Sequence, residues 1–143
     1  MKRSVLIAAV IALTTAFSAP VMANGISIEQ FGIGNAAGGG QVGFNNLIGV
    51  FQNGGGNGVL AQQFGNGNVA AAGQSGFNNG AEIWQAGNGN QGGVGQVGNN
   101  HNFFLSQDGN GNVAAGTQQG NNCNAAISQT GSGNTAAFVQ SCP

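Results

Sequence analysis

Few residues of this 143-residue chain can do acid–base, nucleophilic or metal chemistry. Its carboxylates are Glu29, Glu82 and Asp108, and its single histidine is His101. General acid–base pairs and metal sites both need such groups brought close together, but these four residues are scattered and no two carboxylates stand in a paired spacing. The many Asn-Gly turns lack the Asp that calcium-binding repeats carry in each turn. The sequence therefore predicts no enzyme, no catalytic residue, no cofactor and no metal site.

Glutamine is the residue type with a regular spacing. Gln recurs every eleven residues without a gap, at Gln30, Gln41, Gln52, Gln63, Gln74, Gln85, Gln96, Gln107, Gln118, Gln129 and Gln140. Gly follows two residues after each of the first ten (position +2). Asn follows five residues after most of them (position +5), at Asn35, Asn46, Asn57, Asn68, Asn79, Asn90, Asn112 and Asn134. His101 and Cys123 take position +5 in two further units, and for His101 we expect only a surface substitution.

The chemistry of the repeat selects strands and turns. An eleven-residue period also occurs in helical supercoils, but Gly in every unit would cost a helix about 1 kcal/mol per position relative to Ala. Gly and Asn suit turns, so we expect each corner at Gly-x-x-Asn. The segments between corners are then eleven short strands, over residues 25–30, 36–41, 47–52, 58–63, 69–74, 80–85, 91–96, 102–107, 113–118, 124–129 and 135–140.

Alternation within each strand separates a buried face from a solvent face. Positions +7 and +9 are apolar or Gly in every unit, and they share a face with the next Gln. All three acidic residues fall on the opposite face, as do Phe51, Trp84 and Phe104. Outward aromatic side chains of this kind suit contact with a surface, a sugar or, as the favoured interpretation, a neighbouring assembly of the same chain, and having no use at all is a further alternative.

Strands joined by tight arcs pack face to face and return to the same side after two units. The predicted fold class is all-β: a β-solenoid of strand–arc–strand coils, with 11-residue half-repeats and 22-residue coils. Residues 24–143 form a single domain of five and a half coils, a rod on the order of 25 Å tall. Each Gln then stacks over the Gln one coil away, and the corner Asn residues can do likewise. Such amide ladders are a feature of cross-β structure.

The two ends of this rod lack the usual protection of sheet edges. Native edges carry charge, Pro or a covering element, whereas the first strand has one outward acid, Glu29, and the last strand has no charge. We therefore expect end-to-end addition of subunits, each docked chain becoming a template for the next.

The two cysteines lie where they could meet. Cys123 takes a +5 corner position and Cys142 a +2 corner position, in units two apart, so both lie on the same edge of adjacent coils. That placement suits the Cα separation of roughly 4.4–6.8 Å that a disulfide needs, and an exported protein meets an oxidising compartment. An intrachain disulfide is the favoured interpretation, with two free thiols or a bond between subunits as the alternatives.

The first residues have the layout of a secretory signal. A basic start at Lys2 and Arg3 precedes an apolar stretch and small residues that suit cleavage after Ala23, and the apolar stretch is shorter than the roughly 20 residues that span a bilayer. Residues 1–23 are thus a predicted signal peptide. Because Lys2 and Arg3 are the only basic residues, the mature chain has none with which to bind nucleic acid or anionic lipid. We expect neither nucleic-acid binding nor membrane insertion.

The repeat resembles that of a known family. Asn24–Gln41 (NGISIEQFGIGNAAGGGQ) and Ala61–Gln74 follow a pattern that closely resembles the curlin repeat of bacterial curli subunits, and the resemblance covers nearly all of residues 24–143. It implies an extracellular functional amyloid fibre on the bacterial cell surface, which builds biofilm matrix and mediates adhesion. It also implies three kinds of partner: further copies of the chain, a minor nucleator subunit and an outer-membrane secretion channel.

The chain departs from curlins in three ways. Curlins usually carry a Gly/Pro-rich targeting segment of about twenty residues before the first repeat, whereas this first strand starts almost at the expected cleavage site. The scarcity of charge favours fast polymerisation, and curlins typically lack Cys. Nucleators lose the Gln ladder in some repeats, and because all eleven Gln are kept here, the fibre-forming subunit is favoured over the nucleator.

A soluble β-solenoid that binds ice or a carbohydrate surface is a further alternative. Such a protein would show one residue type at one outward position in coil after coil. Position +8 instead runs through Gly, Leu, Ala, Glu and Phe, and the other outward positions are as mixed. A segment of an adhesin or phage fibre is another alternative, but the predicted signal peptide and the single repeat domain argue against it.

Overall fold

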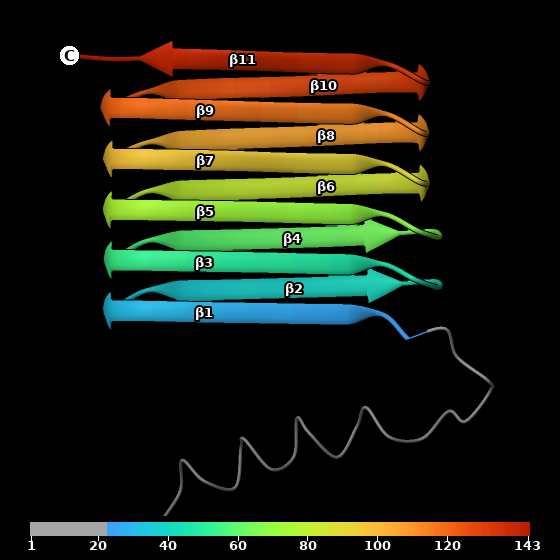
Figure 1. Ribbon diagram of the computed structural model, residues 1–143, viewed down its shortest axis with the longest axis horizontal. Coiled ribbons are helices and arrows are strands. Elements are labelled where there is room, and N and C mark those ends of the chain that lie inside the picture. Colours follow the sequence, from blue (N-terminus) through green and yellow to red (C-terminus); the bar gives the residue numbers. More distant parts are fainter. Residues whose placement is uncertain (1–22) are drawn as a thin grey trace, which may run out of the picture.

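A computed structural model describes residues 23–143, and within that range the chain forms strands and turns without a helix (Figure 1). Apart from Ala23, the predicted signal peptide lies outside the described residues. No described helix is long and apolar enough to cross a membrane. The eleven strands are β1 Gly25–Ile33, β2 Ala36–Val42, β3 Leu47–Gly55, β4 Gly58–Phe64, β5 Val69–Phe77, β6 Gly80–Asn88, β7 Gln91–Asn99, β8 Asn102–Asn110, β9 Val113–Asn121, β10 Asn124–Ser132 and β11 Thr135–Ser141.

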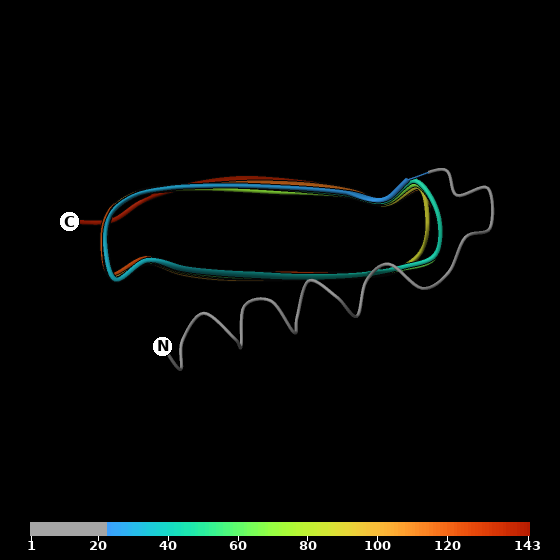
Figure 2. The same cartoon turned by 90° about the horizontal axis from the view of Figure 1, so that it is seen from below.

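The strands form two parallel sheets, one from each side of the coil. Sheet A contains the six odd-numbered strands in the order β1-β3-β5-β7-β9-β11, and sheet B contains the five even-numbered strands from β2 to β10. Every strand pairs with the strand one coil away, so that Gln52 of β3 lies beside Gln74 of β5. Seen along the rod, the coils superpose as a flattened loop (Figure 2). The predicted β-solenoid with 22-residue coils is confirmed.

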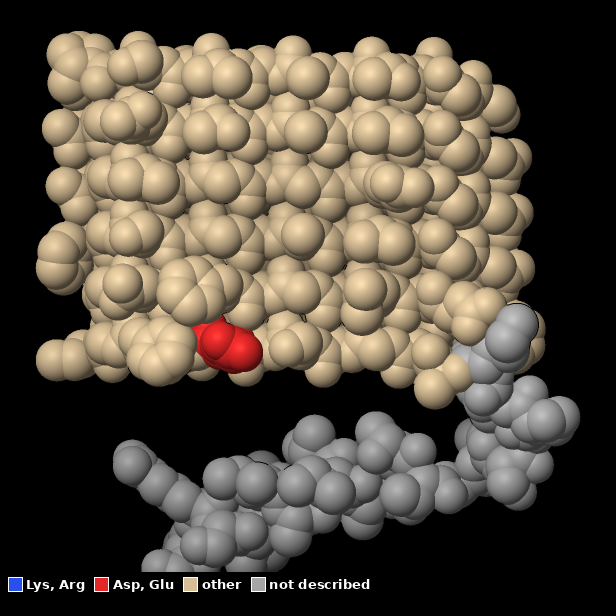
Figure 3. Space-filling model, viewed as in Figure 1, with Lys and Arg blue, Asp and Glu red and all other residues tan. Residues whose placement is uncertain are grey.

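The core lies between the two sheets and is built from the predicted positions. Its buried apolar side chains all come from positions +7 and +9, and they are Ile48, Val50, Val59, Ala61, Ala70, Ala72, Ala81, Ile83, Val94, Phe103, Leu105 and Ala114. The acids stay outside, and the visible face in Figure 3 is almost free of charge. The alternation of apolar and polar residues therefore assigned the two faces correctly.

The strands are longer than expected, and this is a correction to the predicted corners. Eight of the eleven strands have nine residues rather than six. In these eight strands the Gly at position +2 bends the strand, with φ between 103° and 127°, but stays paired, as Gly32 does with Gly54. The left-handed residue lies at position +4 instead, where Gly or Asn has φ between 55° and 70°. The tight part of each corner is therefore shorter than Gly-x-x-Asn.

Glycine at +2 is required by the stacking of the coils. A Cβ at Gly76 would lie 1.9 Å from the carbonyl oxygen of Gly98 in the next coil, and nine of the ten +2 glycines meet the coil above at 1.7–2.0 Å. The tenth, Gly131, has no coil above it within the described residues. The column of +2 positions thus excludes every side chain that would project between two stacked coils.

Candidate assembly site: amide ladders and open ends

The eleven repeat glutamines form two ladders, one in each sheet. Nine hydrogen bonds of 2.6–3.2 Å run from the Nε2 of one Gln to the Oε1 of the Gln 22 residues further along. The second N–H of the amide is used as well: Gln85 donates to the carbonyl of Val69 in the opposite sheet at 3.0 Å. From Gln52 to Gln118 these side chains are at most 1% exposed. Buried amides destabilise a fold when unpaired, and these are fully paired.

The ladders have a direction, so the two ends of the rod differ. Each Gln donates toward the β11 end and accepts from the β1 end. At the β1 end, Gln30 and Gln41 therefore present Oε1 atoms that accept from no Gln within the described residues. At the other end, Gln129 donates to Val113 O and to no Gln of the described chain, and Gln140 accepts from Gln118. One end offers acceptors and the other offers donors.

Six of the eight corner Asn residues are buried, Asn35 is half-buried and Asn134 is exposed, and they do not form the continuous amide ladder that was predicted. The backbone N–H of Asn46 donates to Asn24 Oδ1 at 2.9 Å, and its Nδ2 donates to Gly65 O at 2.8 Å. The same pair of contacts recurs along the rod, and only two amide-to-amide bonds join +5 residues in the part of the chain that the structure describes. These side chains form hydrogen bonds with backbone N–H and C=O groups of the turns, which would otherwise be buried without a partner.

His101 is buried, and the expectation of a surface substitution was wrong. It is 1% exposed. Its backbone N–H donates to Asn79 Oδ1 at 3.0 Å, and its Nδ1 accepts from the Cys123 N–H at 3.2 Å. Nε2 lies 3.1 Å from Val97 O, so the ring fits as the neutral tautomer with its proton on Nε2. His101 thus occupies the structural place of a corner Asn.

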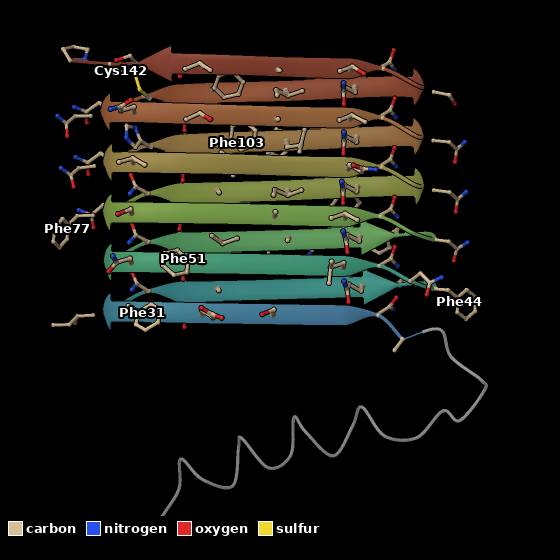
Figure 4. All side chains as sticks on the ribbon, viewed as in Figure 1. Phe31, Phe44, Phe51, Phe77, Phe103 and Cys142 are labelled. Carbon is tan, nitrogen blue, oxygen red and sulfur yellow. A yellow bond between two sulfur atoms is a disulfide. The ribbon has the colours of Figure 1, made fainter. Side chains whose placement is uncertain are left out.

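Asn side chains do form ladders outside the core, at a position that was not predicted from the sequence. At position +3, Asn66, Asn88 and Asn110 are joined by Nδ2–Oδ1 bonds of 3.1 Å along one edge. On the other edge Asn99 donates to Asn121 at 3.1 Å. The recurrence of Asn at position +3 in these units was the sequence pattern that could have indicated these ladders. Toward the β1 end these columns turn apolar, and Figure 4 places Phe44 and Phe77 at opposite edges of the rod.

Cys123 and Cys142 are joined by a disulfide, with an S–S distance of 2.11 Å and a Cα–Cα distance of 5.7 Å. Their sequence separation is 19, the same as that between a corner Asn and the +2 Gly that it contacts, such as Asn46 and Gly65. The disulfide therefore replaces one corner hydrogen bond by a covalent bond. It closes a loop that contains β10 and β11 (Figure 4).

Reducing this disulfide is expected to loosen the last coil. Closing a loop of this size stabilises a fold by about 3 kcal/mol, and both strands in the loop, β10 and β11, are edge strands with a neighbour on one side only within the described residues. We expect faster amide hydrogen exchange in β10 and β11 after reduction, measured by mass spectrometry with and without reductant. Strands β4 to β6 serve as the internal control. Unchanged protection of β10 and β11 would contradict a stabilising role for the disulfide.

Both ends of the solenoid expose core positions. At the β1 end, the inward residues Ile26 and Ile28 are 51% and 41% exposed because no coil of the described chain lies beneath them. At the β11 end, Ile127 and Phe138 line an open cavity of about 440 Å³. Exposed apolar surface that continues a core favours contact with another apolar surface.

The chemistry-bearing residues are not brought together. Among residues 23–143, no group of three His, Cys, Asp or Glu side chains is placed to hold a metal ion. Glu29 lies in β1, Glu82 in β6 and Asp108 in β8, all on outer faces.

Comparison with known proteins identifies the repeat. Residues 76–109, from the end of β5 to the end of β8, match the family model described as the curlin associated repeat. This part of the chain therefore carries a curlin-associated repeat. The match supports a structural subunit of the curli type. No curated protein sequence matches the chain.

Proposed function

We propose that this curlin-repeat chain is the structural subunit of an extracellular curli-like amyloid fibre, which assembles end to end by templated cross-β stacking. The observation that supports this most is the complementarity of the two ends. One end presents Gln acceptors and the other Gln donors, and both expose core side chains beside unpaired strand edges. A docking copy would extend both sheets and both ladders without any change in register.

The proposal extends to how the fibre is exported and used. Residues 1–23 would be removed as a signal peptide, and the mature chain would leave through an outer-membrane secretion channel and be templated on a nucleator subunit. The fibre would serve in biofilm matrix and surface adhesion. The exposed aromatic pairs Phe31–Phe51 and Phe64–Trp84, with ring centroids 5.8 and 4.8 Å apart, lie on the two opposite sheets and suit side-by-side packing of fibres.

We expect purified residues 24–143 to form fibres at micromolar concentration. The fibres should bind thioflavin T, sediment, and give a meridional reflection near 4.8 Å from the stacked coils. A polypeptide that stays monomeric for days, without this reflection, would refute the proposal.

A matched pair of variants tests whether the open end drives assembly. Ile28→Lys places a charge on the inward face of β1, where a docking copy would bury it, and is expected to abolish elongation because an unpaired buried charge is strongly unfavourable. Ser27→Lys places the same charge on the outer face of the same strand and should still form fibres. Equal elongation of the two variants would contradict end-to-end docking.

A further inference from the structure

The described solenoid has an odd number of strands, and this constrains how two copies can stack. Sheet A has six strands and sheet B five, so β1 and β11 both overhang in sheet A. If a second copy stacked without rotation, its β1 would lie on β11. Sheet B would then lack one strand between β10 and the next β2, leaving two strand edges and two Gln positions without neighbours.

A half-turn removes this defect. Rotation by 180° about the rod axis exchanges the positions of the two sheets and keeps the strand directions parallel. The next β1 then lies on β10 and the next β2 on β11, so both sheets continue without a gap. Figure 2 shows a bend beside each of the two arcs, at diagonally opposite corners of the loop, so a rotated copy presents a matching outline. We propose that successive subunits are related by a half-turn, with sheet A of one copy continuing as sheet B of the next. This inference rests on the proposed fibre function.

The residues that meet in this arrangement agree in length and register. Strands β10 and β1 both have nine residues. The repeat places Gln129 beneath Gln30 of the next subunit, which joins the donor of one ladder to the acceptor of the other. Gly131 lies beneath the next Gly32, and a Cβ at Gly131 now meets only Asn134 Nδ2, at 3.7 Å. Asn134 is placed to donate to Gly32 O, as Asn112 donates to Gly131 O at 2.9 Å.

Core packing favours stacking with a half-turn over stacking without rotation. Phe138 of β11 lies over Gly116, where an added Cβ would be 2.3 Å from the Phe138 ring, so the ring occupies the space that Gly116 leaves. After the half-turn, the residue above Phe138 is the next Gly39, again a glycine. Without rotation it is the next Ile28, a bulky side chain on a bulky ring. The half-turn seats Phe138 between two glycines.

Helical reconstruction of the fibres by cryo-electron microscopy tests this directly. The half-turn predicts one subunit per about 26 Å, five and a half coils, with a rotation near 180° between neighbours. Unrotated stacking predicts about 29 Å with a rotation near zero. Fibres of the second kind overturn the half-turn and leave the proposed function intact. Absence of fibres overturns the proposed function and the half-turn with it.

Two double variants provide a test in solution. Ser27, Ala126 and Ala137 all face outward and are exposed. The half-turn places Ser27 of the next copy beside Ala126, whereas unrotated stacking places it beside Ala137. Ser27→Lys with Ala126→Lys should therefore elongate at least about tenfold more slowly at low salt than Ser27→Lys with Ala137→Lys, and added salt should reduce the difference. Equal rates, or the opposite order, would overturn the proposal.

Discussion

Replacing Gly76 by Ala is expected to destabilise the folded solenoid strongly, whereas replacing Gly73 in the same strand is not. Gly76 has φ +127°, and an added Cβ would lie 1.9 Å from Gly98 O, which is backbone and has no freedom to move aside. Positive φ alone disfavours a side chain by about 1–2 kcal/mol, and the overlap would separate two coils. We expect a loss of about 4 kcal/mol or more in the free energy of unfolding.

Gly73→Ala is the matched control. A Cβ at Gly73 meets nothing within 4 Å, and its φ lies outside the left-handed region. This variant should keep its stability or gain up to about 1 kcal/mol from a less flexible unfolded chain. Urea unfolding of the monomer, followed by the fluorescence of Trp84, measures both. Similar unfolding midpoints for the two variants would show that the coils are not in contact at position +2.

Replacing Gln118 by Glu is expected to make folding strongly pH-dependent. Gln118 is fully buried, receives a hydrogen bond from Gln96, and donates to Asn102 O and Gln140 Oε1. An ionised carboxylate there would be buried and would face two oxygen acceptors, so the pKa of the introduced carboxyl should rise in the folded state. A pKa raised by about 3 corresponds to about 4 kcal/mol of lost stability at neutral pH.

The sign of the pH effect follows from the direction of this shift. Below the unfolded-state pKa of about 4.3, the introduced carboxyl is protonated in both states and donates a hydrogen bond much as the amide does. As the pH rises above that value, the unfolded chain ionises first, so stability is lost progressively toward neutral pH. Gln119→Glu, one residue further along and exposed, adds the same charge and should show little of this loss. Parallel pH profiles of urea unfolding for the two variants would contradict a buried ladder.

The sequence was sufficient to predict the solenoid fold because two of its patterns repeat without an insertion or a deletion. The eleven-residue Gln period determines the coil, and the alternation at +7 and +9 determines which side chains enter the core. Neither signal depends on a contact between distant residues, since the residue one coil away is always 22 positions along the chain.

The corners were harder to predict because the alternation changes phase there. Counting back from Gln107, His101 falls on the same alternation as Phe103 and Leu105, which are both inward. Counting forward from Gln96, it falls on the outer face. The Gly at +2, here Gly98 with φ +126°, and the left-handed Asn100 reset the phase between these two counts. Backward counting would have placed His101 and the corner Asn residues inside, and it would have shortened the predicted turns.

The uniform direction of the Gln ladders has an electrical consequence. Each side-chain amide carries a dipole comparable with that of a peptide group, about 3.5 D, and all nine Gln–Gln bonds point the same way along the rod. Rotation about the rod axis does not reverse them, so in the proposed fibre the dipoles of successive subunits would add. A filament built in this way would carry a net dipole along its whole length. Bundles of parallel filaments would therefore have a large net polarisation, whereas in antiparallel bundles the dipoles would cancel.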